Sequence, residues 1–350
     1  MSDLRPSPAC RKAAREAIRT GSKSFYAASM LLPGRVREPA YALYAFCRLA
    51  DDAVDLSLGK KAALARLRDR LDRAYEGAPY DDPADRCFAA MVADYGMPRA
   101  LPEALIEGLA WDSEGRRYET LSDVRAYSAR VAGAVGAMMT VLMGVRAEEA
   151  LGRACDLGVA MQLSNIARDV GEDAREGRIF LPLSWLRAQG IDPGELLAEP
   201  RWTPALGEVV AGLLDEAERL YDRAAWGVRG LPWGVRPSIR AARILYREIG
   251  REVARRGFDS VNGRAVVSAA EKRRLMLGAL TRFGEPPDGR GAPPLPETAY
   301  LVEAVANCPP PPTFVRPTVG DHIGRMAEIL LTANARQATR GMGAARIAGE

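Results

Sequence analysis

Apolar residues recur at helical spacing along nearly the whole chain up to about Gly284, in segments rich in Ala, Leu, Arg and Glu. Alternating β-branched runs bounded by hairpin turns, which would indicate strands, are scarce. Glycine and proline, which end helices readily, interrupt the pattern at Gly59, Gly96 to Pro98, Gly177, Gly190 to Pro193 and Gly230 to Pro232. The sequence therefore predicts an all-α protein, with one large helical domain over residues 1–283.

The C-terminal part of the chain has a different composition. Ten of the 24 prolines lie between Pro286 and Pro317, and this density predicts an extended linker over residues 284–320. Residues 321–350 follow as a tail in which apolar residues keep helical spacing. We expect this tail either to be mobile or to dock on a membrane surface or a partner.

Charge and residue types exclude several classes of function. The net charge is only +4 and the basic residues are spread along the chain, which argues against a nucleic-acid partner. A single histidine, His322, leaves almost nothing for a catalytic triad or a histidine-rich zinc site. The five cysteines are widely spaced, and the N-terminus is charged without an apolar signal core, so we expect a cytoplasmic protein with reduced thiols.

A first acidic helix is predicted from Pro39, a favourable first-turn residue, to Gly59. At about 100° per residue, its polar side chains fall within about 60° of one another. They are Tyr44, Arg48, Asp51 and Asp55. The rest of the helix is mainly apolar, which favours a buried helix whose single charged stripe faces an internal polar cavity.

A second acidic stripe is predicted within residues 157–177. Gln162, Asn165, Asp169, Asp173 and Glu176 share one face of that helix. Aspartates at i and i+4 repel each other, so two such pairs on apolar helices indicate a cation between them, although a single pair would more often be a solvated surface feature. Oxygen ligands without histidine or cysteine favour Mg²⁺ or Mn²⁺, whose coordination is completed by water and phosphate oxygens. The implied substrate carries a phosphate or diphosphate.

Cationic and hydroxyl side chains close to the two stripes are candidates for binding that anionic group. They are Ser22, Lys23 and Ser24 ahead of the first acidic helix, Arg48 within it, and Arg168 and Arg178 around the second. Arg48 is the strongest candidate, because its neighbours are apolar and a buried guanidinium needs an anionic partner.

Four segments of the chain resemble a known family. SKSFYAASMLLPGRVREPAYALYAFCRLADDAVD (22–55) and QLSNIARDVGEDAREGRIFLP (162–182) are similar to the two signatures of the squalene and phytoene synthase family, and residues 127–136 and 246–268 are similar to further family segments. The resemblance covers about residues 10–283. One departure stands at Ser128 and Ala129, where relatives carry Cys-Tyr after the residue that matches Tyr127.

The resemblance implies an isoprenoid synthase fold in which two aspartate-rich helices face each other across a central cavity. It implies head-to-head condensation of two molecules of geranylgeranyl diphosphate, through a cyclopropyl intermediate, to phytoene with release of two diphosphates, the first committed step of carotenoid biosynthesis. Position by position, it assigns metal binding to Asp51, Asp52, Asp55, Asp169 and Asp173, metal or diphosphate contacts to Asn165 and Arg48, and roles in lining the site or binding diphosphate to Tyr44, Tyr246, Arg264 and Lys272. Stimulation by ATP is implied by the family alone, because no P-loop is visible.

An uncharged run, Val131 to Val145, is too short to span a bilayer and is interpreted as a buried helix, with Gly133 and Gly136 allowing close contact. Its Met138, Met139, Leu142 and Met143 either wall the prenyl chains, keeping water from a carbocation, or pack in an ordinary core. The identity of the group that accepts the final proton stays open.

Alternative interpretations remain at this point. A squalene or dehydrosqualene synthase would use farnesyl diphosphate, in the first case with NADPH, since the aspartates do not set chain length. An inactive relative that acts as an assembly or binding factor usually loses acidic ligands, which this chain keeps. An unrelated helical interaction module would place the charged stripes in solvent. Because the product is so apolar, we also expect peripheral association with the inner membrane, and neighbouring carotenoid enzymes are further candidate partners.

Overall fold

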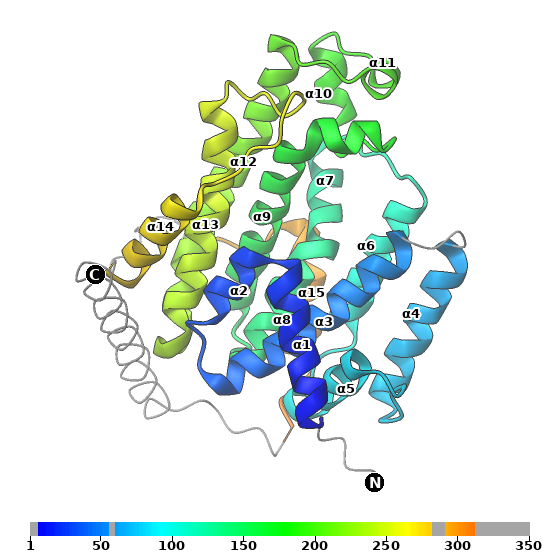
Figure 1. The fold of residues 1–350 in the computed structure, drawn as a ribbon, viewed down its shortest axis with the longest axis vertical. Helices are drawn as coiled ribbons and strands as arrows, with labels where there is room; N and C mark the ends of the chain where they lie inside the picture. Colours follow the sequence, from blue (N-terminus) through cyan, green and yellow to red (C-terminus); the bar gives the residue numbers. More distant parts are fainter. Residues whose placement is uncertain (1–5, 56–59, 282–290, 312–350) are drawn as a thin grey trace, which may run out of the picture.

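A computed structural model describes the backbone of residues 6–55, 60–281 and 291–311, and their side chains except those of residues 51–55, 60 and 280–281. Every regular element in this part is helical, which confirms the all-α prediction (Figure 1). None of these helices is both long and apolar enough to cross a membrane.

The elements follow one another as α1 (Pro8–Gly21), α2 (Lys23–Ser29), α3 (Gly34–Asp55), α4 (Lys60–Tyr75), α5 (Pro83–Tyr95), α6 (Ala100–Ser113), α7 (Leu121–Ser128), the π-helix η1 (Ala129–Gly133), α8 (Ala134–Leu142), α9 (Glu148–Arg175), α10 (Leu183–Ala188), α11 (Pro193–Ala198), α12 (Pro204–Gly227), the 3₁₀ turns η2 (Val228–Gly230) and η3 (Trp233–Val235), α13 (Arg236–Arg255), α14 (Ala269–Thr281), η4 (Pro296–Thr298) and α15 (Ala299–Ala306). Helices end at each predicted break within the described residues, whereas Gly59 lies outside them.

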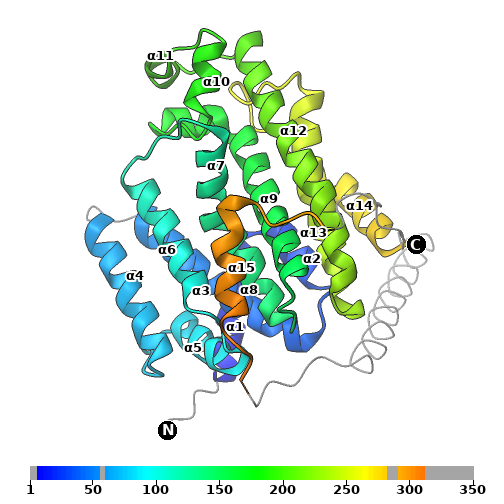
Figure 2. The same ribbon diagram turned by 180° about the vertical axis from the view of Figure 1, so that it is seen from behind.

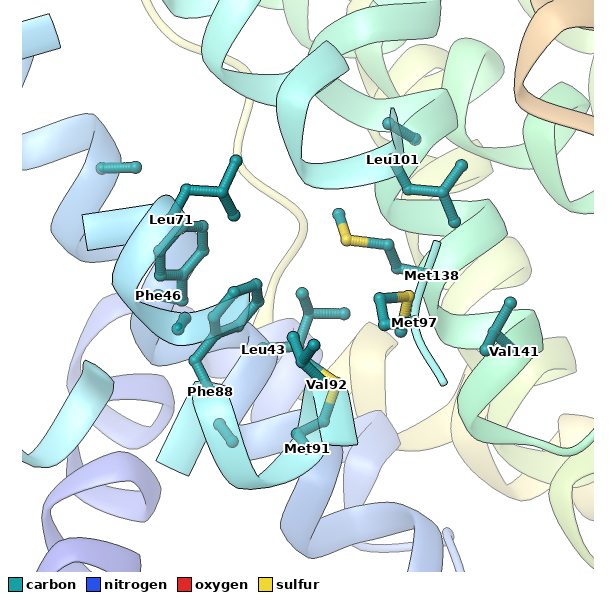
Figure 3. Packing of buried hydrophobic residues seen from close by; sticks show 14 of the residues in the cluster. Leu43, Phe46, Leu71, Phe88, Met91, Val92, Met97, Leu101, Met138 and Val141 are labelled. Carbon is teal, nitrogen blue, oxygen red and sulfur yellow. The ribbon is translucent and has the colours of Figure 1, made fainter. Parts of the chain in front are cut away.

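Helix α9 occupies the middle of the bundle and packs against α8, α12 and α13 (Figure 1). Two large hydrophobic cores lie on its two sides, one built mainly from α1, α3, α4, α5, α6 and α8, the other from α7 and α9 to α13. In the first core the rings of Phe46 and Phe88 stack with their centroids 3.8 Å apart, next to Leu71 (Figure 3). Helix α9 is therefore fixed in position by close packing in both hydrophobic cores.

Helix α3 begins at Gly34 rather than at the predicted Pro39, which lies inside the helix. A proline there has no N–H for the carbonyl of Arg35, four residues earlier. The hydroxyl of Tyr95 donates to that carbonyl at 2.7 Å. Because a side chain from α5 replaces the missing helical bond, the helix continues through the proline.

The predicted buried helix over Val131 to Val145 is instead divided between η1 and α8. Close contact is confirmed at Gly136, where a Cβ would lie 2.3 Å from the carbonyl oxygen of Ala154. Gly158 of α9 meets the carbonyl oxygen of Ala132 in the same way, again at 2.3 Å. At Gly133 the nearest atoms would be 3.7 Å away, so close approach there is not required. Glycines therefore bring η1 and α8 into backbone contact with α9.

Residues 291–311 differ from the predicted linker, because they pack on the domain and include η4 and α15 (Figure 2). Arg153, which is fully buried, donates to the carbonyls of Ala292 and Pro293 at 3.0 and 3.1 Å and pairs with Asp156 at 3.0 Å. The proline density wrongly predicts an extended linker here, because α15 lies between the prolines and contains none. The predicted tail over 321–350 lies outside the described residues.

Candidate active site

A large apolar cavity opens beside α9, with a volume of about 320 Å³. Its walls come from α2, α3, η1, α8, α9 and α13 and from the turn between α12 and α13. The lining is mainly aliphatic and aromatic and includes Phe25, Leu43, Tyr44, Val135, Met161 and Tyr246. Such a lining suits a long hydrocarbon chain.

A polar chamber of about 190 Å³ lies next to the apolar cavity. It is lined by Leu109, Asp112, Tyr127, Gln162, Asn165, Ile166, Asp169, Asp173, Arg178 and Phe180. Gln162 and Asn165 line both spaces, so the two adjoin at that point of α9. This arrangement fits a ligand that has an apolar chain and a polar end.

The second acidic stripe lies where the sequence predicts it for four of its five residues, which line the chamber. Glu176 is exposed and does not line it. Helix α9 supplies the four lining residues from one uninterrupted run of 28 residues. Burial raises the pKa of the Asp173 carboxyl to about 7, an effect that Arg178 opposes and Asp169 reinforces. A buried carboxylate with so little compensating positive charge is a suitable ligand for a cation.

Two arginines form ion pairs with the carboxylate of Asp169. Arg168 contacts its two carboxylate oxygens at 2.7 and 2.5 Å, and Arg264 contacts them at 3.0 and 3.1 Å. Arg178 lies 3.6 Å from Asp173 and also pairs with Glu176. The structure therefore brings Arg168, Arg178 and Arg264 to the acidic stripe, in contact with its carboxylates.

The donor set of the chamber fits a hard divalent cation, since among the described residues carboxylate and amide oxygens line it and no histidine or cysteine does. Within the described side chains, no three acidic, histidine or cysteine groups converge as a complete metal site. The predictions for Asp51, Asp52 and Asp55 concern side chains outside that set. Their helix α3 lines the neighbouring cavity with Tyr44 and Cys47.

Tyr44 and Tyr246 line the apolar cavity, as expected for residues of the site. The Ser22 hydroxyl is hydrogen-bonded to Tyr246, and burial, the dominant effect, raises the pKa of that tyrosine to about 12. Ser22 also caps α2 by accepting from the amide of Phe25. Its position is therefore partly set by helix capping, which the sequence analysis does not consider.

Other predicted residues lie away from both spaces. Lys23, Ser24 and Lys272 line neither the cavity nor the chamber, and Lys23 is exposed. The expectation that Arg48 is buried is wrong, because its side chain is exposed. Among the described side chains of α3, Leu43, Tyr44 and Cys47 line the cavity and Arg48 does not.

Asp112 is a carboxylate of the chamber that the sequence analysis misses. The hydroxyl of Tyr127 donates to it at 2.7 Å. Tyr127 is buried and stacks on Phe180 with ring centroids 5.1 Å apart, and burial followed by the charge of Asp112 raises its pKa. Asp112 carries no pattern in the sequence because it is a single acid near the end of α6.

The methionine-rich segment contributes both to the cavity wall and to an ordinary hydrophobic core. Met139 and Met143 line the apolar cavity, whereas Met138 and Leu142 are fully buried in the first hydrophobic core. The two sets face different sides of one short helix.

The fold and the site define a class, an all-helical protein in which an apolar cavity adjoins a chamber lined by carboxylates. The squalene/phytoene synthase family model matches residues 18–271. The chain is 56% identical over 301 residues to a phytoene synthase of Rhodobacter capsulatus, covering 84% of this chain and 89% of the relative. Identity to a phytoene synthase of Cereibacter sphaeroides is 54% over 313 residues, covering 85% and 88%. The chain belongs to the squalene/phytoene synthase family.

A crystal structure of a dehydrosqualene synthase with a bound ligand is similar to the present one, with a TM-score of 0.71 and 30% sequence identity. The match covers 78% of this chain and 95% of that one. This similarity confirms the isoprenoid synthase fold.

Proposed function

We propose that this chain is a phytoene synthase, which joins two molecules of geranylgeranyl diphosphate head to head and releases two diphosphates. The observation that carries the proposal is the adjacency of the apolar cavity and the polar chamber at Gln162 and Asn165. A prenyl diphosphate has the same two parts, an apolar chain and a highly charged end. The high identity to two bacterial phytoene synthases supports this choice of substrate within the family.

The carboxylates of the chamber are proposed to hold Mg²⁺ or Mn²⁺. Asp169, Asp173 and Asn165 would supply ligands from α9, and Asp51, Asp52 and Asp55 would supply them from α3, as the sequence predicts. Bound divalent ions would stabilise the negative charge that develops on diphosphate as the allylic carbon–oxygen bond breaks.

The basic residues around the chamber are proposed to bind the diphosphate directly. Arg168 and Arg264 share Asp169, and Arg178 approaches Asp173. Guanidinium groups suit this role because they donate several hydrogen bonds to phosphate oxygens in a fixed plane.

The apolar cavity is proposed to protect the carbocation. Its lining leaves few polar atoms that would hold water close to the reacting carbons, and water would trap the cation as an alcohol. Tyr44 and Tyr246 place hydroxyl groups in this wall, which also contains a few other polar side chains such as Thr140 and Ser238. Stimulation by ATP and contact with other carotenoid enzymes stay predictions of the family resemblance.

A product assay tests the proposal. The purified protein with Mg²⁺ and geranylgeranyl diphosphate should form phytoene and two diphosphates per product, and EDTA should abolish turnover. Asp169→Asn should lose activity, whereas Asp215→Asn, an exposed aspartate of α12, should keep it. Farnesyl diphosphate, with and without NADPH, forms the second arm. Formation of squalene or dehydrosqualene in preference to phytoene would refute the proposed substrate.

A further inference from the structure

The turn between α12 and α13 carries the most exposed large hydrophobic side chain among the described residues. Trp233 has 69% of its surface exposed. One exposed apolar side chain needs no explanation by itself. Its surroundings are unusual, however, because the same turn forms part of the cavity wall.

The inner side of this turn closes one end of the apolar cavity. Val228 and Leu231 line the cavity, and a Cβ at Gly230 would lie 3.3 Å from the Cβ of Ala150. Ala150 precedes Gln162, where the chamber begins, by 12 residues of α9. At 1.5 Å per residue this separation is about 18 Å. The turn therefore lies at the apolar end of the site, far from the acidic chamber.

The outer side of the turn carries two arginines, Arg229 and Arg236. Arg223 and Arg247, which flank them in the sequence, are instead paired with acidic residues of the domain. The Arg236 guanidinium lies 4.3 Å from the centroid of the Trp233 ring, and the exposed Arg229 lies 4.8 Å from that of Trp226. Glu149 is an acidic residue beside this turn, and it accepts the indole hydrogen of Trp226 at 2.9 Å.

The first turn of α3 extends this surface. Val36 packs in one hydrophobic cluster with Leu231 and Val235. Arg35 and Arg37 flank Val36 in the sequence, and Arg35 is exposed. Two separate segments thus bring arginines to the region around one exposed indole.

We propose that the surface formed by Arg35, Arg229, Trp233 and Arg236 docks on an anionic phospholipid bilayer. Tryptophan is enriched at the level of lipid headgroups, and arginine is attracted to acidic headgroups. When the protein docks in this orientation, the apolar end of the cavity faces the membrane. A water-insoluble product then reaches lipid across the wall formed by Val228 and Leu231. The purpose of the docking, but not the docking itself, rests on the proposed function.

Vesicle flotation of the full-length protein in EDTA tests this surface without catalysis. Vesicles of phosphatidylcholine alone are compared with vesicles that contain phosphatidylglycerol. Trp233→Ala should weaken binding roughly tenfold, as expected for about 60 Å² of apolar surface at about 25 cal/mol per Å². Arg229→Gln should weaken binding about fivefold on the anionic vesicles only, and added salt should have a similar effect.

Trp202→Ala is the matched control. Trp202 is 37% exposed and precedes α12, whereas Trp233 follows that 24-residue helix, so the two lie about 36 Å apart by the helical rise. The control should bind vesicles like the wild type, and circular dichroism should show that all variants are folded. Equal binding by wild type and Trp233→Ala, or no preference for anionic vesicles, would overturn the proposal.

The experiments distinguish failure of the docking surface from failure of the proposed phytoene synthase activity. Trp233→Ala should keep wild-type turnover on detergent-solubilised geranylgeranyl diphosphate. A protein that makes no phytoene but binds vesicles through Trp233 would refute the proposed function and leave the docking surface intact. An active protein whose vesicle binding ignores Trp233 would refute the docking surface alone.

Discussion

Replacing Asp173 by asparagine should stabilise the metal-free protein at neutral and alkaline pH while removing a proposed metal ligand. The reason is the buried position of this carboxyl, which has a pKa of about 7 in the folded protein against an ordinary value of 3.8. Asparagine has nearly the same shape and no charge. The variant therefore avoids the cost of ionising a carboxyl inside the chamber.

The magnitude follows from the difference between the two pKa values. About three units at about 1.36 kcal/mol each give a cost on the order of 4 kcal/mol. As pH rises, the unfolded chain loses the proton first, because its pKa is lower. The cost is absent below pH 3.8, grows as the pH rises, and is complete above a pH of about 7. The difference in unfolding free energy between Asp173→Asn and the wild type should therefore increase from pH 3.8 to about pH 7.

Urea unfolding in EDTA at pH 5, 6, 7 and 8 measures this difference between variant and wild type. Asp169→Asn is the matched control, because the same helix supplies it but Arg168 and Arg264 bond its carboxylate. It should destabilise the protein by about 1–3 kcal/mol at pH 7. A stability difference between Asp173→Asn and wild type that does not change with pH would contradict the reasoning.

Two further predictions concern the scaffold of the site. Gly158→Ala should destabilise the protein by about 2–3 kcal/mol, because a Cβ would lie 2.3 Å from the backbone oxygen of Ala132. Gly278→Ala, where a Cβ meets nothing within 4 Å, should instead stabilise α14 by about 0.5–1 kcal/mol; equal effects of the two changes in thermal unfolding would refute the close approach. Tyr95→Phe should cost about 1 kcal/mol in urea unfolding, because it removes the bond to the Arg35 carbonyl, and an unchanged midpoint would contradict that account of Pro39.

The sequence alone determines the features that depend on local periodicity. Helical spacing predicts the all-α class, and the same spacing places Gln162, Asn165, Asp169 and Asp173 on one face of α9. These predictions succeed because the helical repeat fixes the relative directions of side chains within one element. The family resemblance, carried by long strings of residues, adds the fold and the proposed reaction.

Only the tertiary structure decides which separate elements meet. Asp112 of α6 and Tyr127 of α7 complete the chamber, and Arg264 reaches Asp169 across 95 residues of sequence. Exposure of Arg48 and the docking of α15 are decided in the same way. Contacts between distant segments depend on how whole helices pack, and no local pattern in the chain records that packing.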